Sequence, residues 1–173
     1  AVPDWGFVLT AAGFVTAFYA VVIGLTQRHP KAVLAYSSVS QMGVVAAVLG
    51  MGLAAGDATA GMAAAFYASH HVLVKGALFL SVGVIAASGA GRRAVVLVPA
   101  MLLCLGLGGL PFTGGAIAKY AVKDQLDVGV VGWLAAASAV GTTLLMLHFF
   151  TRLASYGSED PQASATVGLR WPW

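Results

Sequence analysis

Residues 62–85 read MAAAFYASHHVLVKGALFLSVGVI, an apolar stretch long enough to cross a bilayer that nevertheless carries Tyr67, His70, His71 and Lys75. Tyr67, His71 and Lys75 are spaced four residues apart, so a helix places them on one face, with His70 on its flank. An ionisable group at membrane depth is costly unless it faces water, a partner or the protein interior. The stripe therefore predicts a functional site inside a membrane helix.

The composition is that of a membrane protein. Of 173 residues, 60% are hydrophobic and only 9% are charged, with a mean hydropathy of +0.90. We predict an all-α integral membrane protein, because hydropathy separates five apolar segments of roughly the 20 residues that span a bilayer. The five transmembrane helices are expected at about residues 6–27, 31–53, 61–87, 95–122 and 128–153, in a domain of residues 1–154. The polar tail, residues 155–173, is expected to be a surface loop leading towards a further helix.

Charged residues alternate between the connections. One set of connections is basic and holds Arg28, Lys31, Arg92, Arg93, Arg152 and Arg170. The other set is acidic, with one cation, and holds Asp4, Asp57, Asp124, Asp127 and Lys123. By the positive-inside rule this pattern predicts an N-terminus outside and a C-terminus in the cytoplasm. The expected location is the inner membrane of a bacterial or archaeal cell. The net charge of +3 therefore does not indicate a nucleic-acid partner.

A cluster of glycines with one proline interrupts the fourth apolar segment, where residues 106–115 read GLGGLPFTGG. Proline removes an amide donor and glycine lowers helix propensity, so we predict that the fourth helix is discontinuous. The residues expected to break it are Gly108, Gly109, Pro111, Gly114 and Gly115. Broken helices mark the ion pathway in transporters, and Lys119 follows directly as a second intramembrane cation.

Structural explanations for these features stay open. Glycine-rich spans also arise from close helix packing, and Lys119 could instead extend to the headgroups. The two histidines could be hydrogen-bonded interior residues. Polar side chains on the second segment could line a water wire or join helices by hydrogen bonds; these are Ser37, Ser40 and Gln41.

Three motifs resemble those of a known family. Residues 31–43, KAVLAYSSVSQMG, resemble the K-x-x-LAYSS-x-SQ-x-G signature of antiporter-like subunits of respiratory complex I, Mrp-type cation/proton antiporters and membrane-bound hydrogenases. Residues 71–83, HVLVKGALFLSVG, are similar to the family's H-x-x-x-K-x-x-LFL-x-x-G helix. Residues 109–119 resemble its GLP-x-x-G broken helix and the lysine that follows. The resemblance runs from the first segment to the fifth.

In this family two inverted five-helix repeats each build half of a proton path, and the chain resembles only the second repeat. The resemblance implies that Lys75 and His71 carry protons at the centre and that Lys119 is the lysine of the broken helix. It places Lys31 near the cytoplasmic end of its helix. The full predicted relay is Lys75, His71, Lys119, Lys31, His70 and Tyr67. The chain departs from the family at Tyr67, where some relatives have histidine, and at His29, where an acid often precedes the lysine.

The resemblance implies proton relay within a larger complex of the complex I, Mrp antiporter, hydrogenase or carbon-uptake type. The expected protein partners are other membrane subunits or the missing first repeat. The expected ions are protons, with or without sodium, and the helices are expected to contact lipid. No cofactor is expected, because the chain has one cysteine, Cys104, and no nucleotide loop or haem motif. A structural scaffold and a small-solute carrier are the alternative functions.

Overall fold

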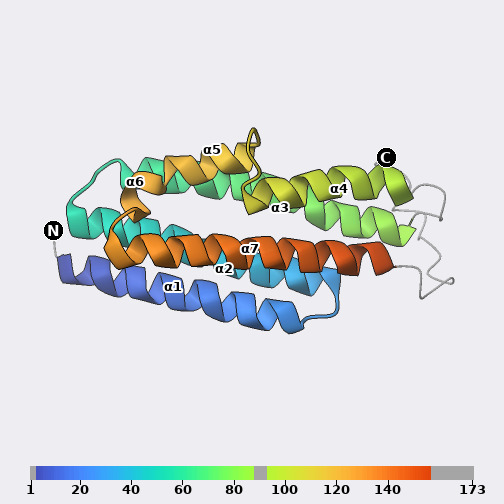
Figure 1. Ribbon diagram of the computed structural model, residues 1–173, viewed down its shortest axis with the longest axis horizontal. Helices are drawn as coiled ribbons and strands as arrows, with labels where there is room; N and C mark the ends of the chain where they lie inside the picture. The colour runs from blue at the N-terminus through green and yellow to red at the C-terminus, as the bar shows by residue number, and fades with distance from the viewer. Residues whose placement is uncertain (1–2, 88–92, 157–173) are drawn as a thin grey trace.

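The computed structural model describes residues 3–87 and 93–156, all of whose regular elements are helices (Figure 1). Four of these helices are long and apolar enough to cross a membrane. They are α1 (Pro3–Thr26), α2 (Pro30–Ala55), α3 (Ala60–Ala87) and α7 (Gly129–Ser155). Three shorter helices lie between α3 and α7: α4 (Arg93–Gly108), α5 (Gly114–Ala121) and α6 (Lys123–Leu126).

The four long helices coincide with four of the five predicted segments. The segment over residues 95–122, predicted to be a discontinuous helix, corresponds to two helices, α4 of 16 residues and α5 of 8 residues. The apolar helix α4 is shorter than the four long helices and by itself is too short to span the membrane. Residues 157–173 of the predicted tail lie outside the described part of the chain.

Helices α1 and α2 run antiparallel with their backbones in close contact (Figure 1). A Cβ atom added at Gly13 would lie 2.5 Å from the Gly43 carbonyl oxygen, and one at Gly43 would lie 2.5 Å from the Gly13 carbonyl oxygen. Small residues at such a crossing let membrane helices approach closely, because apolar burial supplies no attraction between helices in lipid. The α1–α2 contact therefore depends on both glycines.

Replacing Gly13 tests this contact. In Gly13→Val the new side chain meets the backbone of α2, which cannot move aside as a flexible side chain would. We expect the free energy of unfolding to fall by about 1–3 kcal/mol, the usual cost of overpacking. Unfolding in mixed detergent micelles measures it, with Ala11→Val on the exposed face of α1 as the control. Equal stability of the two variants would contradict the prediction.

The buried side chains form three layers along the bundle. One apolar cluster includes Tyr67 and Val44, and the other includes Leu34 and Leu78. Between them, α2, α3 and α7 contribute a polar layer of buried residues: Ser37, Ser40, Gln41, His71, Lys75, Ser138 and Thr142. Since α2 contacts both α3 and α7, these polar positions meet midway along the bundle.

The two ends of the bundle differ in charge. One end, on the left in Figure 1, carries Asp4 in α1, Asp57 before α3, Asp124 in α6, Asp127 and Lys123. The opposite end carries Arg28, Lys31, Arg93 and Arg152, while Arg92 and Arg170 lie outside the described residues. Asp57 accepts a hydrogen bond of 3.1 Å from Gln125, which ties α6 to the α2–α3 connection. Hydrogen bonds from Thr59 and Gln125 lower the pKa of the Asp57 carboxyl.

Candidate functional site

The polar stripe of α3 faces the interior. Tyr67, His71 and Lys75 are 7%, 3% and 4% exposed, whereas Val72 and Leu73 beside them are 63% and 76% exposed. In a water-soluble protein a helix buries its apolar side and exposes its polar side. Helix α3 does the reverse, as a helix surrounded by lipid requires. The prediction that the stripe points inward is confirmed. His70, on its flank, is half-buried.

Lys75 is held against α2. Its Nζ donates a hydrogen bond of 3.4 Å to the Leu34 carbonyl oxygen. The single ion pair among the described residues joins Lys123 to Asp127, at 3.8 Å, near the acidic end. Lys75 is therefore a buried amine without a carboxylate partner in the described part of the chain.

His71 lies one helical turn from Lys75, and neither of its ring nitrogens has a hydrogen-bond partner among the described residues. The hydroxyl groups of Ser37, Ser40 and Ser138 in the same polar layer are likewise unpaired there. Buried polar atoms almost always have a partner, and bound water is the usual one where the protein supplies none. The layer is thus chemically suited to hold water between helices.

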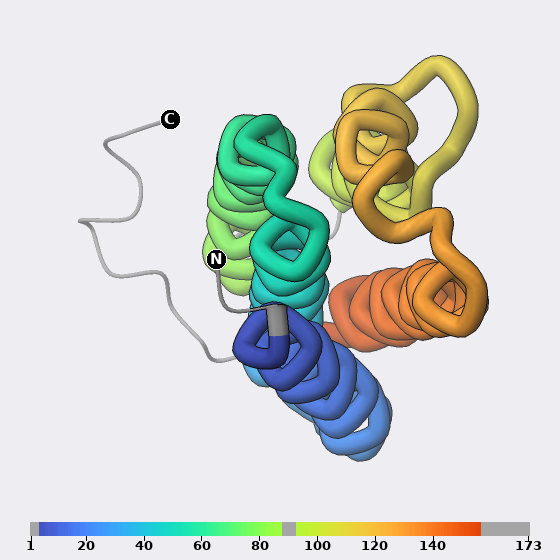
Figure 2. The backbone as a smooth tube through the Cα atoms, turned by 90° about the vertical axis from the view of Figure 1, so that its left-hand side faces the viewer, coloured from blue at the N-terminus to red at the C-terminus, as the bar shows by residue number. Residues whose placement is uncertain are grey.

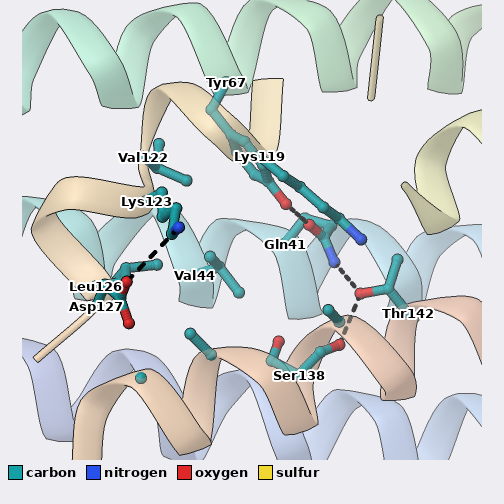
Figure 3. Close-up of a pocket in the computed structure, with 13 residues that line it drawn as sticks. Gln41, Val44, Tyr67, Lys119, Val122, Lys123, Leu126, Asp127, Ser138 and Thr142 are labelled. Atoms are coloured by element: carbon teal, nitrogen blue, oxygen red, sulfur yellow. Dashed lines mark hydrogen bonds and ion pairs between the residues drawn. The ribbon is translucent and has the colours of Figure 1, made fainter. Parts of the chain in front are cut away.

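A chain of hydrogen bonds within this layer joins three helices (Figure 3). The Tyr67 hydroxyl donates to Gln41 Oε1, and Gln41 Nε2 donates to Thr142 Oγ1. Thr142 Oγ1 in turn donates to the Ser138 carbonyl oxygen at 2.9 Å. Of the three polar residues predicted on α2, Gln41 therefore joins helices directly, while the buried Ser37 and Ser40 hydroxyl groups do not.

A cavity of about 250 Å³ adjoins the same chain of hydrogen bonds (Figure 3). Its polar lining comes from Gln41, Tyr67, Lys119, Ser138 and Thr142, and its far end from Lys123 and Asp127. The last two side chains are 60% and 66% exposed, so the cavity extends from the polar layer towards the acidic end of the bundle. One turn of helix, α6, forms part of its wall through Lys123 and Leu126.

The interruption between α4 and α5 is built by Gly109 before the chain reaches Pro111. Gly109 has a φ of 99°, and its amide donates to the Gly106 carbonyl oxygen at 2.9 Å. The amide of Leu110 donates to the Leu105 carbonyl oxygen at 3.0 Å, which completes the Schellman pattern of a helix C-terminus. Pro111 follows in the exposed turn.

The other predicted break residues allow close approaches around this turn. A Cβ atom at Gly115 would collide with the Gly106 carbonyl oxygen, and one at Gly114 would lie 2.9 Å from Nε2 of His70. Gly108, the last residue of α4, lies against the Thr143 side chain. Thr113 begins α5 by accepting a hydrogen bond of 3.4 Å from the Ala116 amide.

Lys119 turns back towards the interruption. Its Nζ donates a hydrogen bond of 2.6 Å to the carbonyl oxygen of Gly108, at the C-terminal end of α4. Thr143 Oγ1 lies 3.5 Å from the same oxygen. A cation is favourable at this end of a helix, where carbonyl groups lack amide partners. The side chain is thus directed away from the charged end formed by Lys123 and Asp127 (Figure 3).

Lys31 does not join the other predicted relay residues. It is exposed in the first turn of α2, at the basic end, where its amide donates to Nδ1 of His29 at 3.2 Å. Sequence reasoning also missed the contribution of α7, which supplies Ser138, Thr142 and Thr143. The only signal in the sequence was the spacing of Ser138 and Thr142, four residues apart in the apolar part of the fifth segment.

Comparison with known proteins identifies the family. Residues 1–146 match the family described as NADH:quinone oxidoreductase/Mrp antiporter, TM. The chain belongs to this family. One relative is F(420)H(2) dehydrogenase subunit N of Methanosarcina mazei, which is 26% identical. The match covers 99% of this antiporter-family chain and 38% of the length of the relative. The putative antiporter subunit mnhA2 of Staphylococcus saprophyticus is 31% identical over 68% of the chain and 17% of its own length.

A third relative, the putative antiporter subunit mnhA2 of Staphylococcus aureus, is 28% identical over 69% of the chain and 18% of its own length. The chain therefore spans less than two fifths of the length of these relatives. No solved structure matches it. The antiporter-like family expected from the three motifs is confirmed, and with its apolar helices the chain is an integral membrane protein.

Proposed function

We propose that this chain conducts protons as part of a larger ion-translocating membrane complex, with Lys75, His71 and Lys119 as the carriers. The observation that carries the proposal is the buried polar layer, in which Lys75 lacks a carboxylate and both nitrogens of His71 are free of partners among the described residues. A buried amine without a counter-charge gives up its proton more readily than one in water. An imidazole can accept a proton on one nitrogen and release one from the other.

The route follows the polar groups towards the acidic end. Protons pass between Lys75 and His71 through water held by the serine hydroxyl groups of the polar layer. They reach Lys119 along the cavity beside Tyr67 and Gln41, which extends to the exposed Asp127. Lys31, at the opposite end, is the entry or exit residue on the cytoplasmic side.

The membrane placement is part of the same proposal. Helices α4 and α5 together make one interrupted crossing, the fourth of five along the chain, because the pair has the combined length that α4 alone lacks. The basic end lies in the cytoplasm of a bacterial or archaeal cell and the acidic end outside, following the charge at the two ends of the bundle. Other membrane subunits, or the rest of a longer chain, supply the other half of the path, in a complex I, Mrp antiporter, hydrogenase or carbon-uptake type of assembly.

Replacing His71 tests the relay. We expect His71→Ala to slow proton uptake by vesicles containing the complete complex about a hundredfold, the lower end of what a positioned proton-transfer group contributes. Added imidazole should restore part of the rate, because it can occupy the space and carry the proton. Ser69→Ala, on the exposed side of α3, is the control and should transport normally.

A purely structural scaffold gives a different result. In that case His71→Ala would leave transport by the assembled complex unchanged, or would reduce it only by reducing assembly, which imidazole would not repair. Subunit content measured on the same vesicles separates these outcomes.

A further inference from the structure

The cavity beside the polar layer reaches only part of that layer. Its lining includes the three buried side chains that are joined by hydrogen bonds, Tyr67, Gln41 and Thr142. Other buried residues of the layer have unpaired polar groups and do not line the cavity; these are Ser37, Ser40 and His71. The three joined side chains therefore mark a boundary within the layer.

Contacts between α2 and α3 place this boundary along the bundle. The two helices run antiparallel (Figure 1), and the Lys75 ammonium marks one level where it meets the Leu34 carbonyl oxygen. Tyr67 marks a second level, where its hydroxyl meets Gln41. His71 lies between the two levels, one helical turn, or about 6 Å, from Tyr67. The cavity extends from Gln41 in the other direction, towards the acidic end.

The boundary crosses three helices. Figure 2 looks along the bundle and shows α3 and α7 on different sides of α2, which contacts both. Gln41 on α2 joins Tyr67 on α3 to Thr142 on α7. We call these three residues the Gln41 bridge. Their side chains are 2%, 7% and 2% exposed, so the bridge is buried throughout its length.

The hydrogen bonds of the Gln41 bridge have a fixed direction. The one hydroxyl hydrogen of Thr142 is donated to the Ser138 carbonyl oxygen, so Thr142 Oγ1 can only accept from Gln41. The Gln41 amide nitrogen therefore faces Thr142, and its oxygen accepts from Tyr67. A side-chain amide does not titrate, and the carbonyl oxygen at the end has no proton to pass on. The bridge closes the path and does not conduct protons itself.

We infer that Gln41 is the gate of the proton path between His71 and Lys119. While the Gln41 bridge is intact, water in the cavity is separated from His71. Protons cross when the Gln41 amide turns into the adjoining cavity, whose volume of about 250 Å³ has room for the amide and for water beside it. The inference rests on the proposed function, because it takes His71 and Lys119 as the carriers. It adds a positioning residue that controls the passage between them.

The reactivity of a thiol behind the bridge measures the gate. Cys104 is the one cysteine of the chain, so Cys104→Ala with Ser37→Cys, which we call the parent, carries a single thiol. Ser37 precedes Gln41 by one helical turn, on the side away from the cavity. A small cationic methanethiosulfonate is added to membranes with the complete complex, on the side at which the exposed Asp124→Cys reacts rapidly. Mass spectrometry of this chain gives the rates, and we expect the parent to react far more slowly than Asp124→Cys.

Variants of the Gln41 bridge should open the path in a graded way. Gln41→Ala removes two hydrogen bonds, which should raise the open population and the rate at position 37 by about 30-fold. Thr142→Val keeps the side-chain shape and removes one of them, so about a fivefold increase is expected. Thr142→Ser keeps the hydroxyl, and Met42→Ala shortens an exposed neighbour on α2; both should react at the parent rate.

Three results would overturn the gate. They are equal rates in Gln41→Ala and the parent, a parent thiol that reacts as fast as that of Asp124→Cys, and a gain in reactivity only from the basic side.

The gate and the proposed function can fail separately, because thiol reactivity does not require proton transport. If the rates rise as expected while His71→Ala transports normally in an assembled complex, the relay is wrong and Gln41 controls only the access of water. If the rates do not change while His71→Ala loses transport, the gate is wrong and the relay stands.

Discussion

Lys75→Ala should abolish proton movement while the complex still assembles. Lys75 is 4% exposed and has no carboxylate partner in the described part of the chain, so its removal leaves no opposite charge unpaired. The Leu34 carbonyl that it contacts also accepts a hydrogen bond of 3.1 Å from Ser38 Oγ and is not left without a donor. Removing an isolated desolvated charge therefore does not cost stability through electrostatics and can add to it.

The variant Lys75→Arg separates proton exchange from charge. A guanidinium group keeps its proton in proteins, so the positive charge is preserved while exchange is blocked. We expect a loss of proton uptake of about a hundredfold or more in both variants. Lys75→Met keeps most of the side-chain volume, so a loss of uptake in this variant cannot be caused by the cavity that alanine leaves.

Proton uptake by vesicles with the complete complex is the measurement, with subunit content checked on the same sample. Arg152→Ala removes an exposed charge at the end of α7 and should transport normally. A scaffold role predicts the reverse order for Lys75, with arginine tolerated and alanine either neutral or harmful to assembly. Normal uptake in fully assembled Lys75→Ala would refute the relay.

Lys119→Ala should stop proton movement by a similar factor, for a reason that involves the interruption of the helix. The ammonium group lies 2.6 Å from the Gly108 carbonyl oxygen, at the border of the cavity that extends to Asp127. Without it, the proposed path has no carrier between the polar layer and the acidic end. The loss of a cation at the C-terminus of α4 should cost only about 0.3–1 kcal/mol, too little to prevent assembly.

The variant Lys119→Arg decides between a carrier and an anchor. A lysine that only anchors a helix at the membrane surface can be replaced by arginine, which also extends its charged group to the headgroups. A carrier cannot be replaced in this way, because arginine does not release its proton. We therefore expect Lys119→Arg to transport as poorly as Lys119→Ala. Tyr120→Leu, at the neighbouring exposed position of α5, is the control and should retain uptake.

The sequence predicted the helices well because their signals are local. Long apolar runs need no tertiary information to be recognised as membrane helices, and the period of the helix placed Tyr67, His71 and Lys75 together on one face. Three short motifs indicated the family to which the chain belongs. The orientation in the membrane and the proton-carrying roles stay predictions.

The site was predicted only in part because its geometry depends on packing between helices. Nothing local distinguishes Ser138 and Thr142 from polar residues that merely satisfy their own helix, and α7 reveals their role only where it meets α2. The direction of Lys119, towards Gly108 and not towards a bundle end, depends on the position of α5 beside α4.

The turn between α4 and α5 shows the same division most clearly. By itself, the sequence predicted a break in the helix within residues 106–115, because glycine and proline change backbone preferences wherever they stand. Only the tertiary structure decided that Gly109 ends α4, that Gly115 permits the contact with Gly106 and that Phe112 is left uncovered. The physical reason is that a backbone preference belongs to one residue, whereas a close approach, a cavity or an exposed ring belongs to segments that only folding brings together.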